Sequence, residues 1–230
     1  MKWLNDVQSQ IKTKSDEEAS TINEEFLKMA IGILAFALPA TMIISAGLSD
    51  DCNTVQPSIS AYYHTGARDL FVGILCAVGV AMFGYKGYSK YDNFFATLAS
   101  IAAIVVALCP TSVSNPLGDC IENVIDTGWQ NVVHLTAAAT LFIVLAIFCV
   151  LLFTITDPNP TRKRLKRNMI YYSCGFIIIA SLIFIAISMN VDGFPQKILG
   201  FPVVFIFEAI ALVAFSVSWF TKSKIIYSRW

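Results

Sequence analysis

Ionisable residues inside apolar segments are the first candidates for chemistry in this chain. Glu208 lies eight positions after Gly200 within an apolar run, and at about 1.5 Å per helical residue this places it roughly 12 Å below the start of the run. An acid at such a depth is protonated, paired or beside water, and is a candidate functional residue. A neutral acid that is hydrogen-bonded to a neighbouring helix is the structural alternative.

Other ionisable residues lie near the ends of apolar runs. His134 opens one run, Asp69 begins another, and His64 lies in the approach to Asp69. In a compact bundle, Asp69, His134 and Glu208 can converge below one surface, with His64 at the mouth. We therefore predict a ligand-binding site that consists of Tyr62, Tyr63, His64, Arg68, Asp69, His134 and Glu208.

Two imidazoles and a carboxylate can hold zinc or another divalent metal with one position open for water. Such a metal turns bound water into a nucleophile, so His64, His134 and Asp69 form a metal-site hypothesis. The sequence has no HExxH, no CxxC and no closely spaced histidine pair, and histidines near helix ends commonly hydrogen-bond the backbone. The first expectation is therefore a protein without a cofactor.

The cysteines allow one disulfide on the outer side, if that compartment is oxidising. Cys52 and Cys120 fall in predicted outer loops, and we predict that they pair. Cys109 with Cys120 is the alternative, because connectivity does not follow from sequence alone.

Composition places these residues in a membrane protein. Hydrophobic residues make up 56% of the 230-residue chain and charged residues only 14%, against about 25% charged in soluble domains. Six apolar runs approach or exceed the roughly 20 residues that cross a bilayer core. They are Met29 to Leu48, Asp69 to Tyr88, Phe94 to Cys109, Val132 to Thr154, Met169 to Met189 and Leu199 to Phe220. We predict an all-α bundle of six transmembrane helices.

The basic residues predict the orientation of this bundle. Of the 16 Lys and Arg residues, only Arg68 and Lys197 fall on the side opposite the N-terminus. Basic segments favour the cytoplasm, so both termini are predicted to be cytoplasmic in the inner membrane of a bacterium. The predicted parts are an amphipathic N-terminal segment at 1–28, the membrane domain at 29–220 and a tail at 221–230. Residues 1–28 either lie on the membrane surface or extend the first helix.

The predicted outer side is acidic, and its charges suggest what it attracts. It carries Asp50, Asp51, Asp69, Asp119, Glu122, Asp126 and Asp192.

There is no basic face outside the loops that flank the membrane, so nucleic acid is not an expected partner. The TRKRLKR run that begins at Thr161 is expected to contact lipid headgroups.

Small residues predict how the helices associate. Gly73, Ala77, Ala81 and Gly84 share the Asp69 face of the second run, and small faces are where membrane helices touch. We therefore expect Asp69 to point into the bundle. The corresponding face of the third run could support a homo-oligomer together with that of the second; it holds Ala96, Ser100, Ala103 and Ala107. For the third run, Asp92 is the expected N-cap.

Certain segments carry a resemblance to known families. SISAYYHTGARDLFVGIL, YKGY at Tyr85 to Tyr88 and FEAIALVAFSVSWFTK at Phe207 to Lys222 resemble bacterial six-helix membrane proteins of unknown function. They are more distantly similar to the DRAM and Sfk type of eukaryotic six-helix proteins. The resemblance implies an integral membrane protein and transfers no catalytic residue. The CREST group of membrane hydrolases is similar in its acidic residue and histidines, but it uses three histidines and seven helices.

The leading functional hypothesis is a non-enzymatic membrane protein that binds a small ligand, lipid or ion from its acidic outer side through Glu208. An oligomeric channel or a sensor would fit this description. One alternative is a membrane-embedded, metal-dependent hydrolase at the two-histidine and carboxylate site. A second alternative is a proton-coupled transporter that uses Glu208.

Overall fold

A computed structural model of the chain describes residues 2–48, 54–87, 89–112, 128–154 and 161–223, with the backbone alone for 2–22. This part of the chain is dominated by α-helices, as predicted. They are α1 (Lys2–Leu48), α2 (Arg68–Gly84), α3 (Lys90–Leu108), α4 (Gly128–Ile147), α5 (Arg162–Asn190) and α6 (Val203–Lys222). The structure also has four short elements: the 3-10 helix η1 (Ser60–His64), the π-helical turn η3 (Phe148–Leu152), and the strands β1 (Lys197–Ile198) and β2 (Phe201–Pro202), all within the described residues.

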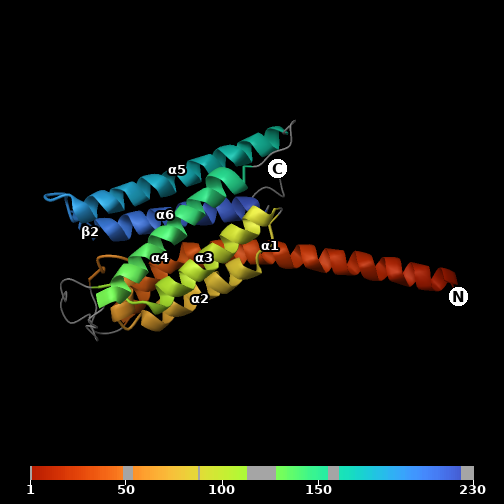
Figure 1. Ribbon diagram of the computed structural model, residues 1–230, viewed down its shortest axis with the longest axis horizontal. Coiled ribbons are helices and arrows are strands. Elements are labelled where there is room, and N and C mark those ends of the chain that lie inside the picture. Colours follow the sequence, from red (N-terminus) through yellow and green to blue (C-terminus); the bar gives the residue numbers. More distant parts are fainter. Residues whose placement is uncertain (1, 49–53, 88, 113–127, 155–160, 224–230) are drawn as a thin grey trace.

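The helices form a closed ring. Each one packs against the next in sequence, and α6 returns to pack against α1. Figure 1 shows them side by side and alternating in direction. The C-terminal ends of α1, α3 and α5 therefore share one end of the bundle with the N-terminal ends of α2, α4 and α6. We call this the Glu208 end, and the opposite one the Trp219 end.

Length and surface identify a multi-pass membrane protein. In the described residues, five helices are long and apolar enough to cross a membrane; they contain Asn23–Leu48, Lys90–Leu108, Gly128–Leu152, Arg162–Asn190 and Val203–Lys222. The remaining helix, α2, has 17 residues and is about 26 Å long, slightly short of the roughly 30 Å hydrocarbon core. Large apolar side chains point outward around the ring, as expected for a surface in contact with lipid, including Phe36, Phe83, Ile101, Phe176 and Ile183.

The first helix continues well beyond the apolar run from Met29 to Leu48. Residues 2–28 and the first apolar run form one uninterrupted helix of 47 residues. Figure 1 shows its N-terminal half extending past the Trp219 end of the bundle. The backbone is therefore that of an extended first helix, one of the two predicted alternatives for this segment.

The small-residue face of α2 turns outward, contrary to the prediction. Asp69, Gly73 and Ala77 are exposed, because the opposite face carries large apolar residues that fill the bundle. Its buried residues are Phe71, Leu75, Val78, Gly79 and Met82. The small face of α3 is in turn buried inside the same chain, with Ala96, Ser100, Ala103 and Ala107 nearly inaccessible. It therefore does not offer the surface that the oligomer hypothesis required.

An aromatic cluster fills the interior near the Trp219 end. The Trp219 ring lies 5.0 Å from Tyr85, 5.4 Å from Phe153, 5.7 Å from Phe215 and 5.9 Å from Phe148, measured between ring centroids. Two of these rings flank the π-helical turn: Phe148 begins it and Phe153 follows it, and the Phe153 amide donates to the Phe148 carbonyl at 2.9 Å. That extra residue per turn lets Phe148 and Phe153 face the same tryptophan. Aromatic side chains thus fill the centre of the helix ring near the Trp219 end.

The starts of α3 and α6 differ from the sequence predictions in a way that local contacts explain. Ser89, not Asp92, is the N-cap of α3: its hydroxyl accepts from the Asp92 amide, and the Asp92 carboxylate accepts from the Ser89 amide. This reciprocal pair is a capping box. The sixth helix begins at Val203 rather than Leu199, because a β-hairpin precedes it. Leu199 and Gly200 form its turn with positive φ angles of 52° and 86°, as a type I′ turn requires.

The glycines of α2 provide a test of its orientation. A side chain at Gly79 would meet Ile104 Cγ1 at 2.8 Å and the Ser100 carbonyl at 3.2 Å, whereas Gly73 has open space. Gly79→Leu should lower the free energy of unfolding by about 1–3 kcal/mol, as overpacking does. Gly73→Leu, the matched control, should leave it unchanged or raise it slightly, because glycine is unfavourable inside helices. Thermal unfolding of both variants in detergent measures this. Equal losses would contradict the assigned face.

Candidate functional site

The connection between α1 and α2 folds back onto the Glu208 end of the bundle. Within this 54–67 segment, η1 and its neighbours are buried, including Ile59, Tyr62 and His64. The Phe205 amide of α6 donates to the Pro57 carbonyl at 3.2 Å, and the Phe205 ring packs on Tyr62. An irregular segment therefore covers one end of the helix ring.

Glu208 is the central contact between this segment and α6. Its Oε2 atom accepts a hydrogen bond of 2.6 Å from the Ile59 amide, 149 residues away in sequence. This distance is short for an N–H···O hydrogen bond. Nearby, the hydroxyls of Ser58 and Ser60 lie 3.2 Å apart. One carboxylate oxygen is thus occupied by backbone, which leaves the other for a second partner.

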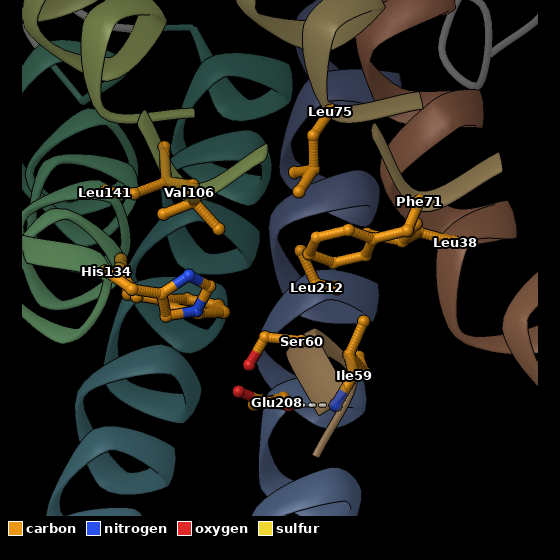
Figure 2. Close-up of a pocket in the computed structure, with 12 residues that line it drawn as sticks. Leu38, Ile59, Ser60, Phe71, Leu75, Val106, His134, Leu141, Glu208 and Leu212 are labelled. Atoms are coloured by element: carbon orange, nitrogen blue, oxygen red, sulfur yellow. Dashed lines mark hydrogen bonds between the residues drawn. The ribbon is translucent and has the colours of Figure 1, made fainter. Parts of the chain in front are cut away.

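A small cavity lies beside Glu208 inside the bundle. Its polar lining consists of Ser60, His134 and Glu208, and its walls come from the surrounding helices, among them Leu38, Phe71, Leu75, Val106, Leu141 and Leu212. Figure 2 shows the carboxyl, the hydroxyl and the imidazole around one space, with the apolar side chains above them. The volume of about 40 Å³ is enough for roughly three waters, at about 10–15 Å³ for each. It is far below the roughly 300–1,000 Å³ of sites for drug-sized ligands.

His134 and His64 both hydrogen-bond the chain where it leaves α3. His134 Nδ1 lies 2.6 Å from the Cys109 carbonyl, and His64 Nε2 lies 2.7 Å from the Thr111 carbonyl. A carbonyl only accepts, so each of these ring nitrogens carries a proton. The neutral His134 ring then has Nε2 as its acceptor. Both histidines thereby satisfy carbonyls that α3 can no longer pair, and His134 also faces the cavity.

The remaining predicted binding residues lie elsewhere. The Tyr62 hydroxyl accepts a 3.4 Å bond from the Gln56 amide, and burial raises the pKa of Tyr62 above its ordinary value of 10. Arg68 donates to the Tyr63 hydroxyl at 2.9 Å, and its guanidinium lies 4.6 Å from the Tyr63 ring centroid. Asp69 is exposed at the start of α2. Of the seven predicted residues, His134 and Glu208 are those that line the cavity.

The metal hypothesis concerns residues that the structure describes, whereas the disulfide hypothesis concerns residues outside them. In the part of the chain that the structure describes, no group of three or more His, Cys, Asp or Glu side chains is placed to hold a metal. His64 and Asp69 do not line the cavity with His134, so a site of these three residues stays a prediction. Cys52 and Cys120 both lie outside the described residues.

Sequence reasoning missed the contribution of Ser60 and Ile59. Ile59 acts through its amide, which no side-chain motif reveals. The hydroxyl of Ser60 is one of several in the polar stretch before α2, and nothing in its spacing separates it from Ser58. The apolar walls are likewise contributed by separate helices, so only the tertiary fold brings them together.

Comparisons of the chain with protein-family models, with curated proteins and with solved structures gave no match. The resemblance to six-helix membrane proteins of the DRAM and Sfk type therefore stays a prediction.

The bond between Glu208 and Ile59 can be tested by two substitutions at one position. Glu208→Ala leaves the Ile59 amide without its acceptor, which should cost about 1–3 kcal/mol of unfolding free energy. Glu208→Gln keeps a carbonyl oxygen that can accept the bond, so it should cost clearly less. Thermal unfolding, together with limited proteolysis of the 54–67 segment, measures both effects. Asp69→Ala, which removes an exposed carboxylate near the same end, is the control. If both Glu208 variants match that control, the bond does not hold the segment.

Proposed function

We propose that this chain is an integral membrane protein with six spans, in which α2 also crosses the bilayer and both termini are cytoplasmic. The described basic residues support this orientation, because they concentrate at the Trp219 end, with Lys86, Lys90, Lys222 and the Arg162–Arg167 run. At the Glu208 end the described basic residues are Arg68 and Lys197. By the positive-inside rule the Trp219 end then faces the cytoplasm. The inner membrane of a bacterium is the location that we propose.

We further propose that the protein binds a small cation or a proton at Glu208 from the outer side. The observation that carries this proposal is the water-sized cavity with a carboxyl, an imidazole and a hydroxyl on its lining. Its polar atoms include the second carboxylate oxygen and the acceptor nitrogen of a neutral His134, which suit a cation or proton better than an anion. The volume disfavours a lipid or a larger organic ligand at this position.

Binding at Glu208 would act on the segment that covers the cavity. A carboxylate accepts hydrogen bonds more strongly when charged, so protonation would weaken its bond to the Ile59 amide. A cation on the other oxygen would instead keep the carboxylate charged and the bond in place. The two ligands therefore have opposite effects on the 54–67 segment, and this segment is the element that would report occupancy.

The aromatic cluster favours a binding or sensing role over an open pore. Its rings fill the bundle interior around Trp219, which is 0% exposed. A cation that moved from the cavity toward the Trp219 end would have to pass these buried rings. Permeation, as in a channel or proton-coupled transporter, would require the cluster to rearrange. An oligomer would have to use surfaces other than the buried small face of α3.

Ligand-linked stability tests the proposed site. The unfolding midpoint in detergent is measured against pH and against added Na⁺, K⁺ or Ca²⁺ at constant ionic strength. A bound cation should stabilise the wild type, by about 2.7 kcal/mol at about 100 times its Kd. Glu208→Gln should remove that response, because it abolishes the charge and retains the shape.

The matched control is Asp69→Asn, which neutralises an exposed carboxylate at the same end of the bundle. It should respond as the wild type does. An identical response of the wild type and Glu208→Gln to pH and to each of the cations would exclude Glu208 as the binding residue.

The metal-dependent hydrolase remains the alternative enzyme class, with zinc or another divalent metal at the histidines. It predicts a stoichiometric metal in the gently purified protein, measured by elemental analysis, and loss of that metal in His134→Gln. The cation proposal expects no tightly retained transition metal. A full equivalent of zinc that depends on His134 would favour the hydrolase.

A further inference from the structure

A second hollow lies on the outside of the bundle, between α5 and α6 near the Trp219 end. Its lining consists of Lys166, Met169, Ile170, Ser173, Cys174 and Val217, and its volume is about 480 Å³. It is therefore an apolar groove with one basic side chain at one end of it. The hollow is shallow and open to the surroundings of the bundle.

The length of α5 places this groove at a defined depth. The apolar stretch from Met169 to Met189 spans about 32 Å, which matches a hydrocarbon core of about 30 Å. Lys166 lies three residues before that stretch, or about 4.5 Å beyond the hydrocarbon boundary. Its ammonium is thus at the level of lipid phosphates, while Ile170 and Cys174 are at the level of acyl chains.

The charge at the head of the groove is strongly positive. The first two turns of α5 carry Arg162, Lys163, Arg164, Lys166 and Arg167, and its first turn contains no acidic residue. An anionic headgroup is complementary to this charge, and each basic residue near a membrane surface favours anionic lipid. The apolar floor below is complementary to an acyl chain. A single molecule that has both an anionic headgroup and an acyl chain would match both parts of the groove.

We infer that the groove between α5 and α6 binds one anionic phospholipid of the leaflet at the Trp219 end. Lys166 contacts the phosphate, and an acyl chain lies along Met169, Ile170, Ser173 and Val217. This site is separate from the Glu208 cavity and does not depend on the function proposed for it.

Native mass spectrometry of the full chain in detergent tests the site. The protein is titrated with phosphatidylglycerol or with phosphatidylcholine of identical acyl chains. The wild type should prefer phosphatidylglycerol, and Lys166→Gln should weaken phosphatidylglycerol binding about fivefold, as expected for the loss of one basic residue. Val217→Trp, which fills the groove and keeps the charge, should weaken binding of both lipids.

Lys90→Gln is the matched control, since Lys90 is an exposed lysine at the same end of the bundle and outside the groove. It should leave both affinities unchanged. Equal affinity of the wild type for the two lipids would overturn the inference. So would equal losses in Lys166→Gln and Lys90→Gln, which indicate diffuse attraction, or unchanged binding in Val217→Trp.

Discussion

The hydrogen bond from the Ile59 amide to the Glu208 carboxyl is the contact on which the organisation of one bundle end depends. Non-helical backbone inside a membrane protein must find hydrogen-bond partners within the protein. The 54–67 segment meets this requirement through Glu208 for the Ile59 amide and through Phe205 for the Pro57 carbonyl. The acid that anchors this segment is therefore also an acid that lines the cavity.

The histidines follow the same logic at the exit of α3. His134 and His64 donate to the Cys109 and Thr111 carbonyls, which the helix itself leaves unpaired. At the opposite end of the bundle, within the part of the chain that the structure describes, Glu25 Oε2, Asp92 Oδ1 and Trp219 Nε1 are buried without a hydrogen-bond partner in the protein. Each such atom costs about 1–3 kcal/mol unless water or an ion meets it.

Sequence reasoning succeeded where the cost of burial decides the outcome. Glu208 was predicted to be paired or beside water because hydrocarbon penalises a charge, and His134 was predicted to face the bundle from the small residues that follow it; both line the cavity. Asp69 was predicted inward from the small residues beside it, but Phe71 and Leu75 on the opposite face fill the bundle better. Small residues mark close helix contacts only where a neighbour is present, and sequence does not say which neighbour that is. The position of the 54–67 segment beside the cavity could not be predicted from the sequence, because it depends on backbone groups that are far apart in the chain.

The uninterrupted first helix has a mechanical consequence. Leu38 of α1 lines the Glu208 cavity, and the same helix continues without a break to Lys2. At 1.5 Å per residue, the helix extends about 54 Å from Leu38 to its start, so a tilt of about 5° pivoting there displaces that start by about 5 Å. A small change in the tilt of α1 at the cavity thus becomes a displacement of several ångströms at the start of the helix. The start of α1 is therefore the part of this helix that moves most when α1 tilts at the cavity.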